Sequence, residues 1–299
     1  MPVRLFLANQ VVRYSMRRKL AQRGDIGPLR AMMSKMAEDV GPPPPQVELE
    51  PVTLDGIPGE TLTPRKADPT AAILYLHGGA FIAGAPRNHR ALTWRLADGC
   101  GVTVYAIDYR LAPEHRFPAG LDDCVRAYRA LLDRGVKRIA IAGDSAGGNL
   151  TLATALDVVR AGITPPVALA CLSPVVTLSA ELASVTTNQH RDSMFPPNML
   201  PGVVARYLGE GDPTDPRASP LNARDLSGMP PTIFQCSENE ILRDHSIEMS
   251  AKLRAAGVTT ELEIEPNAFH VWQLAADQVP ESRRAIERLV AFLRPRLRP

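Results

Sequence analysis

The 299-residue sequence has no long apolar run, no closely spaced cysteines and no excess of one charge. No stretch approaches the roughly 18 consecutive apolar residues that a membrane-spanning helix needs, so we expect no stable membrane insertion. The 34 basic and 32 acidic residues nearly balance. Because no basic stripe is present either, the sequence argues against a nucleic-acid partner.

Cysteine is scarce and scattered. The four cysteines form no C-x-x-C pair and have no histidine at zinc-ligand spacing: Cys100, Cys124, Cys171 and Cys236. We therefore expect reduced thiols, no metal site and a cytoplasmic protein. The phosphate-binding motifs G-x-x-x-x-G-K-[ST] and G-x-G-x-x-G are absent as well, which argues against a kinase or a dehydrogenase.

Strand-like and helix-like segments alternate along most of the chain. Two short strands, 47–54 and 57–63, flank Asp55-Gly56 and predict a hairpin. Further strands are expected at 71–77, 102–109, 138–144, 167–173, 231–237 and 259–265, with helices at 89–100, 121–135, from 146, at 244–256 and from about 281. The strands are apolar on both faces, so the pattern predicts an α/β fold with a mostly parallel central sheet covered by helices on both faces.

Two segments fall outside this alternation. Residues 1–40 have helical patterns and lead into the stiff linker GPPPPQ. The apolar side chains of 3–20 fall on one helical face, which packs on the protein or docks on a membrane surface: Leu5, Ala8, Val12, Met16 and Leu20. Residues 177–215 supply prolines, a short helix and no strand. We predict a helical cap segment and linker (1–45) and a catalytic domain (46–299) with a cap insertion at about 177–215.

A candidate nucleophile lies in RIAIAGDSAGGNL, residues 138–150. The segment Gly143-Asp144-Ser145-Ala146-Gly147 matches G-x-S-x-G at the end of a strand and the start of a helix. Such a sharp turn requires small neighbours and exposes the serine hydroxyl at the end of the sheet. Ser145 is therefore predicted to be the nucleophile.

A serine hydroxyl is a weak nucleophile and needs a base with an orienting acid. In this motif's fold the acid and then the histidine follow the serine along the chain. His270 follows the strand 259–265 and is the predicted base, whereas His190 and His245 are weaker candidates.

The acid should follow the strand 231–237, where three carboxylates stand. Asp244 begins the next helix, where capping is its ordinary role, and Glu240 lies in the preceding loop. We predict Glu240, with Glu238 and Asp244 as alternatives.

Attack on an acyl carbon creates an oxyanion that backbone N–H groups stabilise. The expected strand 71–77 ends in His77 and is followed by Gly78-Gly79. We predict that the amides of Gly78 and Gly79, with that of Ala146, form the oxyanion hole. His77 is expected to fix this loop rather than to act in catalysis.

Three segments together resemble a known family. HGGAF (77–81), DYRLAPEHRFPAGLDD (108–123) and GDSAGGN (143–149) are similar to the hormone-sensitive-lipase-like carboxylesterases, the HGGG-type branch of the α/β-hydrolase fold. The resemblance implies that Ser145 is the nucleophile and His270 the base. The sequence departs from the family pattern twice: Ala80 replaces a third glycine, and Glu240-Ile241-Leu242 stands where Asp-Pro-Leu is common.

These observations predict a serine carboxylesterase for short- to medium-chain acyl esters, with a small-molecule ester as its partner. No metal or organic cofactor is needed. Five methionines in the two cap pieces favour irregular apolar ligands: Met32, Met33, Met36, Met194 and Met199. The alternatives are an amidase or lipase with the same triad, or a ligand-binding receptor of this fold that lacks catalysis. Similar proteins often dimerise through a sheet edge, so the sequence leaves a homodimer open.

Overall fold

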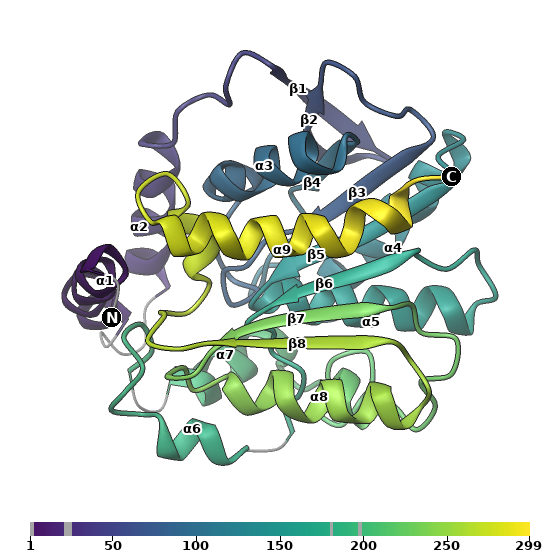
Figure 1. Cartoon of the computed structure of the whole chain (residues 1–299). Coiled ribbons are helices and arrows are strands. Elements are labelled where there is room, and N and C mark those ends of the chain that lie inside the picture. Colours follow the sequence, from purple (N-terminus) through teal and green to yellow (C-terminus); the bar gives the residue numbers. More distant parts are fainter. Residues whose placement is uncertain (1–2, 21–25, 180–181, 197–198) are drawn as a thin grey trace.

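The computed structural model describes residues 3–20, 26–179, 182–196 and 199–299 (Figure 1). Within these ranges the strands form one sheet in the order β1-β2-β4-β3-β5-β6-β7-β8. The strands are β1 (Val47–Leu54), β2 (Ile57–Pro64), β3 (Ala71–Leu76), β4 (Thr103–Ile107), β5 (Arg138–Asp144), β6 (Ala168–Leu172), β7 (Thr232–Ser237) and β8 (Thr260–Glu265). The strands β1 and β2 are antiparallel to their neighbours, and all other pairs are parallel.

The predicted hairpin is confirmed. Leu54 pairs with Ile57, and the two residues between them both have positive φ, 47° at Asp55 and 79° at Gly56. This is the geometry of a type I′ turn, whose twist matches that of the flanking strands.

Helices cover both faces of the sheet. They are α1 (Val3–Leu20), α2 (Gly27–Glu38), α3 (Arg90–Cys100), α4 (Ala119–Asp133), α5 (Ala146–Arg160), α6 (Ala183–Thr187), α7 (Met199–Leu208), α8 (Arg243–Ala255) and α9 (Pro280–Leu297), with short 3₁₀ turns η1 (Pro86–His89), η2 (Pro220–Asn222) and η3 (Trp272–Ala275). Figure 1 shows α9 running along one face of the sheet.

Two apolar cores lie on opposite faces of the sheet. Along β3, Ala72, Leu74 and Leu76 belong to the core that includes α4, α5 and α8. The intervening Ala71, Ile73 and Tyr75 belong to the core that includes α3 and α9. Successive side chains of a strand point to opposite faces, so a strand buried on both sides is apolar throughout. The predicted α/β architecture is confirmed.

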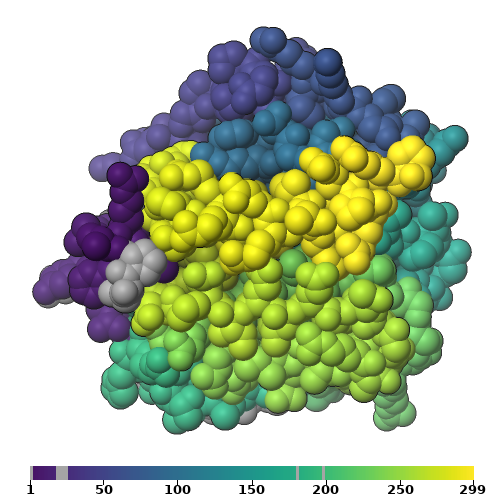
Figure 2. Space-filling view, viewed as in Figure 1, coloured from purple at the N-terminus to yellow at the C-terminus, as the bar shows by residue number. Residues whose placement is uncertain are grey.

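The N-terminal helices lie together at one side of the molecule (Figures 1 and 2). In α1, Leu5 is buried against Phe269 and Trp272, and Ala8 and Val12 pack partly against the same cluster. The side chain of Leu20 lies outside the described residues. None of the described helices is long and apolar enough to cross a membrane.

The predicted break in the alternation is also observed. The described residues of 177–215 contain two short helices, α6 and α7, where one was expected, and no strand. Element ends differ slightly from the prediction: β4 covers 103–107 rather than 102–109, and α9 begins at Pro280.

Candidate active site

Ser145 occupies the predicted turn between β5 and α5. Its φ of 54° and ψ of −116° are values that non-glycine residues rarely adopt. Its backbone N–H donates to the carbonyl oxygen of Leu172 on β6, at 2.8 Å. The residue is only 8% exposed and lines a cavity. The strained turn therefore holds the hydroxyl at the carboxyl end of a central strand.

Backbone crowding explains the small residues around Ser145. A Cβ atom on Gly147 would lie 1.9 Å from the carbonyl oxygen of Leu76, and one on Gly143 would lie 2.4 Å from the carbonyl oxygen of Gly147. These are backbone contacts that cannot be relieved by a side-chain rotation. Both positions thus require glycine for the turn to form.

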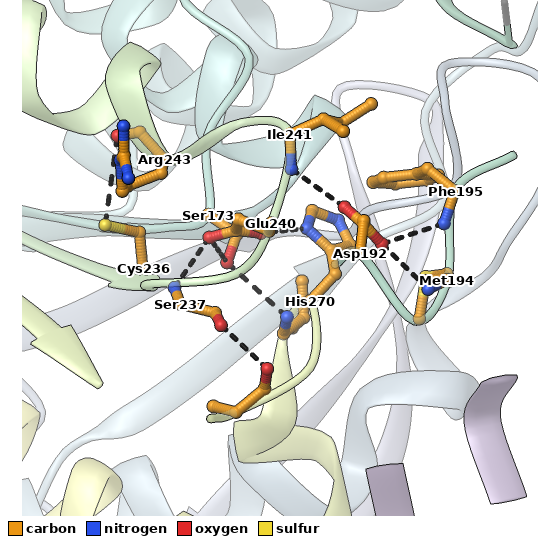
Figure 3. A network of polar contacts seen from close by, with 12 residues as sticks. Ser173, Asp192, Met194, Phe195, Cys236, Ser237, Glu240, Ile241, Arg243 and His270 are labelled. Atoms are coloured by element: carbon orange, nitrogen blue, oxygen red, sulfur yellow. Dashed lines mark hydrogen bonds and ion pairs between the residues drawn. The ribbon is translucent and has the colours of Figure 1, made fainter. Parts of the chain in front are cut away.

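Glu240 and His270 form a buried pair on the loops that follow β7 and β8 (Figure 3). The Nδ1 atom of His270 lies 2.6 Å from Oε2 of Glu240. The other carboxylate oxygen accepts the hydroxyl of Ser173 at 2.9 Å and the backbone N–H of Ser237 at 2.8 Å. Because a carboxylate accepts at Nδ1, the Nε2 atom of a neutral His270 carries the free lone pair.

The two other acids considered for this role lie elsewhere. Glu238 forms an ion pair with Arg191 at 3.6 Å, and its side chain is 44% exposed. The Asp244 carboxylate accepts the N–H of Ser184, at 2.8 Å, in the first turn of α6. The expectation that Asp244 caps its own helix is wrong, because the N-cap of α8 is Leu242.

Ser145 and His270 line the same cavity, which has a volume of about 580 Å³. Its walls come mainly from α1, α2, three side chains of the insertion and the region after β8. They are largely apolar: Leu7, Ala8, Val11, Val12, Met16, Leu29, Met33, Met36, Met194, Phe195, Met199, Phe269, Leu274, Ala275 and Val279. Four of the five predicted methionines line it. The fifth, Met32, is buried in α2. A concave apolar site with few polar groups is typical of small-molecule binding.

The glycine loop after β3 lines the cavity beside Ser145, but the Gly78 prediction needs correction. The Gly78 N–H donates to the buried carboxylate of Asp144 at 3.0 Å, so this N–H is not free to donate to an oxyanion. A Cβ atom at this position would lie 2.1 Å from that carboxylate, which explains the glycine. Within the described residues, the amides of Gly79, Ala80 and Ala146 have no hydrogen-bond acceptor.

Asp144 ties this loop to the nucleophile turn. Its carboxylate also accepts the Tyr75 hydroxyl at 2.6 Å and lies 3.1 Å from Nε2 of His89. Nδ1 of His89 lies 3.2 Å from the carbonyl oxygen of Ala85. Both acceptors lack a hydrogen, so the two contacts together favour the protonated form of His89, in which both ring nitrogens donate. Burial lowers the pKa of His89, but Asp144 outweighs it and the net shift is upward.

His77 supports the same loop and is buried. Its Nδ1 atom lies 2.8 Å from the carbonyl oxygen of Gly78, and its ring stacks on Tyr109 with 4.3 Å between centroids. Burial and then the neighbouring His89 lower the pKa of His77 to about 4, so it is neutral near pH 7.

The two weaker base candidates lie apart from Glu240. His190 is exposed. His245 is 1% exposed, and its Nδ1 atom accepts the N–H of Val176 at 3.1 Å. Burial lowers the pKa of His245 to about 4.

Replacement of His245 with asparagine should therefore reduce acid sensitivity. The pKa of a histidine in the unfolded chain is about 6.5, whereas that of His245 in the folded protein is about 4. Between these two pH values the unfolded chain binds more protons than the folded one. A fall in pH through this range therefore favours unfolding. Asparagine keeps an acceptor for Val176 without the titration. We expect denaturant unfolding at pH 7 and 4.5 to show a loss of stability smaller by about 2 kcal/mol in the variant. The matched change His190→Asn should leave that loss unaltered, and an equal effect of both would contradict the explanation.

Sequence reasoning missed His89, Asp192 and Phe195. His89 contacts Asp144, and Phe195 lies against His270 with 4.6 Å between ring centroids. Asp144, the partner of His89, is the variable residue before the serine in the G-x-S-x-G motif, so the motif itself could have drawn attention to it. His89 and Asp192 meet their partners only through the fold, and no local pattern marks them.

Comparison with known proteins places the chain in a family. Residues 73–274 match the α/β hydrolase fold family. An acetyl-hydrolase of Streptomyces hygroscopicus is 39% identical over 279 residues, which cover 91% of each chain. A crystal structure described as an esterase from the bacterial hormone-sensitive lipase family superposes with a TM-score of 0.92 at 35% identity, covering 100% of this chain and 99% of the other. The esterase EstE5, soaked with p-nitrophenyl butyrate, gives a TM-score of 0.91 at 33% identity over 99% of both chains. The chain belongs to the hormone-sensitive-lipase-like carboxylic ester hydrolases of the α/β hydrolase fold.

Proposed function

We propose that this protein is a serine carboxylesterase that hydrolyses short- to medium-chain acyl esters through a Ser145–His270–Glu240 triad. The observation that supports it most is the buried Glu240–His270 pair, whose histidine shares one apolar cavity with the strained Ser145. The order of the three residues along the chain is the order expected for this fold.

In this mechanism His270 acts first as a base. Its Nε2 atom takes the Ser145 proton while the serine oxygen attacks the ester carbonyl carbon. The resulting imidazolium is stabilised by Glu240 and then protonates the departing alcohol. Water hydrolyses the acyl-enzyme in the same way, with His270 again as the base, and the acid product leaves with Ser145 restored.

The oxyanion would be held by the amides of Gly79, Ala80 and Ala146. Ala80 keeps the N–H that a third glycine would supply, since only proline lacks it. Its φ of 57° lies in the left-handed region where glycine is favoured. Each such donor lowers the barrier by about 3 kcal/mol.

We also propose that segment 1–45 and the insertion at about 177–215 form a cap over this site. Its support is the cavity lining, since α1 and α2 supply one wall and Met194, Phe195 and Met199 another. The cap would exclude water and select the acyl chain, while the domain 46–299 carries the triad.

A rate profile over p-nitrophenyl esters from C2 to C16 tests the activity and the chain length together. A cavity of about 580 Å³ has the size of a small-molecule site, so we expect the maximum kcat/KM at or below about eight acyl carbons. Ser145→Ala, assayed alongside, gives the background. A maximum at C16 would identify a lipase instead. A wild type that is no faster than the uncatalysed reaction on every ester would favour a non-catalytic receptor.

A further inference from the structure

The insertion contributes a buried carboxylate to the loop that carries Glu240. Asp192 is only 1% exposed. Its Oδ1 atom accepts the N–H groups of Met194 and Phe195, at 2.7 and 2.9 Å, and its Oδ2 atom accepts the N–H of Ile241 at 2.8 Å (Figure 3). The first two bonds close a local turn. The third reaches the residue directly after Glu240, and no local turn requires it.

Two other side chains of the insertion bind the same loop. Nδ2 of Asn188 donates to the carbonyl oxygens of Glu238 and Glu240, at 3.0 and 2.9 Å. The Ser184 hydroxyl donates to the carbonyl oxygen of Ile241 at 2.7 Å. The backbone on both sides of the Glu240 side chain is therefore held from the insertion.

The turn closed by Asp192 also places an aromatic ring against His270. Phe195 is 8% exposed, lines the cavity and contacts the imidazole with 4.6 Å between centroids and 58° between planes. One carboxylate thus binds the peptide beside the acid and closes the turn that carries the ring beside the base.

The helix α1 is attached to the same segment. Arg17 donates to the carbonyl oxygens of Gln189 and Asp192, and Arg13 to those of His190 and Arg191. Because α1 lines the cavity, the segment 188–195 connects a wall of the pocket with the Glu240–His270 pair.

We propose that Asp192 is a positioning residue that locks the segment 188–195 onto the Glu240 loop and so holds Glu240 and His270 in the geometry needed for proton transfer. This inference rests on the proposed triad. Asp192 touches no reacting atom and acts through Ile241 and Phe195. A displacement of about 1 Å in a catalytic group can cost about 100-fold in rate. The loss should fall on kcat, because orientation of the base matters mainly in the transition state.

Two substitutions separate the local turn from the link to the acid loop. Asp192→Asn keeps one acceptor oxygen for Met194 and Phe195 but presents an amide nitrogen to the N–H of Ile241. Asp192→Ala removes all three bonds. The matched control is Asp212→Asn, since the Asp212 carboxylate accepts the N–H and hydroxyl of Thr214 in a similar local turn of the same insertion.

The readouts are kcat and KM on one p-nitrophenyl ester, the thermal unfolding midpoint, and the rate and stoichiometry of labelling by an organophosphonate. We expect kcat to fall about 10-fold in Asp192→Asn and about 100-fold in Asp192→Ala, with KM within about 3-fold of wild type. Labelling should slow in parallel and still reach one label per chain. Asp212→Asn should match the wild type, and if Asp192→Ala does not fold, Asp192→Asn decides.

Three results would overturn the inference. A kcat of Asp192→Asn equal to that of the wild type would show that the link to Ile241 is not used. A rise in KM at unchanged kcat would show that Asp192 shapes only the pocket. Failure of the wild type to be labelled would overturn the proposed triad, and this inference with it. The first two results leave labelling of the wild type intact, so the two kinds of failure are distinguishable.

Discussion

Ser145→Ala is expected to lower kcat for ester hydrolysis by about 10⁶-fold, because the hydroxyl that forms the acyl-enzyme is removed. The fold should persist, since the backbone N–H of residue 145 keeps its bond to Leu172 and alanine fits the space of serine. KM should change little, because the apolar cavity walls are untouched. Steady-state kinetics on a short-chain p-nitrophenyl ester measures both constants.

The control for this substitution is Ser227→Ala, because Ser227 is exposed and is not among the residues that line the cavity. It should have wild-type kinetics. Retention of more than about a tenth of the wild-type kcat by Ser145→Ala would assign the nucleophile to another residue, because removal of the true nucleophile lowers kcat by several orders of magnitude.

His270→Ala is expected to cost nearly as much, about 10⁶-fold in kcat, because without the base the serine remains a weak nucleophile. The double variant Ser145→Ala/His270→Ala should be scarcely slower than either single variant, since the two groups act as one unit. Active-site residues that function independently would instead show multiplied losses. The three variants are compared by kcat on the same ester at high enzyme concentration.

His190→Ala provides the matched control, since this imidazole is exposed and lies outside the cavity lining. Its kcat should be that of the wild type. A double variant slower than either single variant by a further factor of about 100 would contradict the shared mechanism.

Much of the fold could be predicted because its signals are local. Strands buried on both faces read as continuous apolar runs, as in β3, β5 and β6. The hairpin at Asp55-Gly56 follows from two residues that tolerate positive φ. The positions of Ser145, Glu240 and His270 after β5, β7 and β8 also follow from topology, because the carboxyl ends of parallel strands meet at one edge of the sheet.

What could not be predicted depends on contacts between distant segments. The sequence places two glycines after β3 but does not show that Asp144, 66 residues beyond Gly78, occupies the first amide. The choice among Glu238, Glu240 and Asp244 depends on the conformation of one loop, which Asn188 and Asp192 hold from about 50 residues away. Such side-chain contacts to loop backbone leave no periodic pattern in the sequence.

The site of covalent labelling by an organophosphonate tests most directly whether Ser145 is an activated nucleophile. The label is located by mass spectrometry of the intact chain and of its peptides. We expect one adduct per chain, on the peptide containing Ser145, with its formation abolished by Ser145→Ala and greatly slowed by His270→Ala. An adduct on another residue, or no adduct in the wild type, would contradict an activated serine in this cavity.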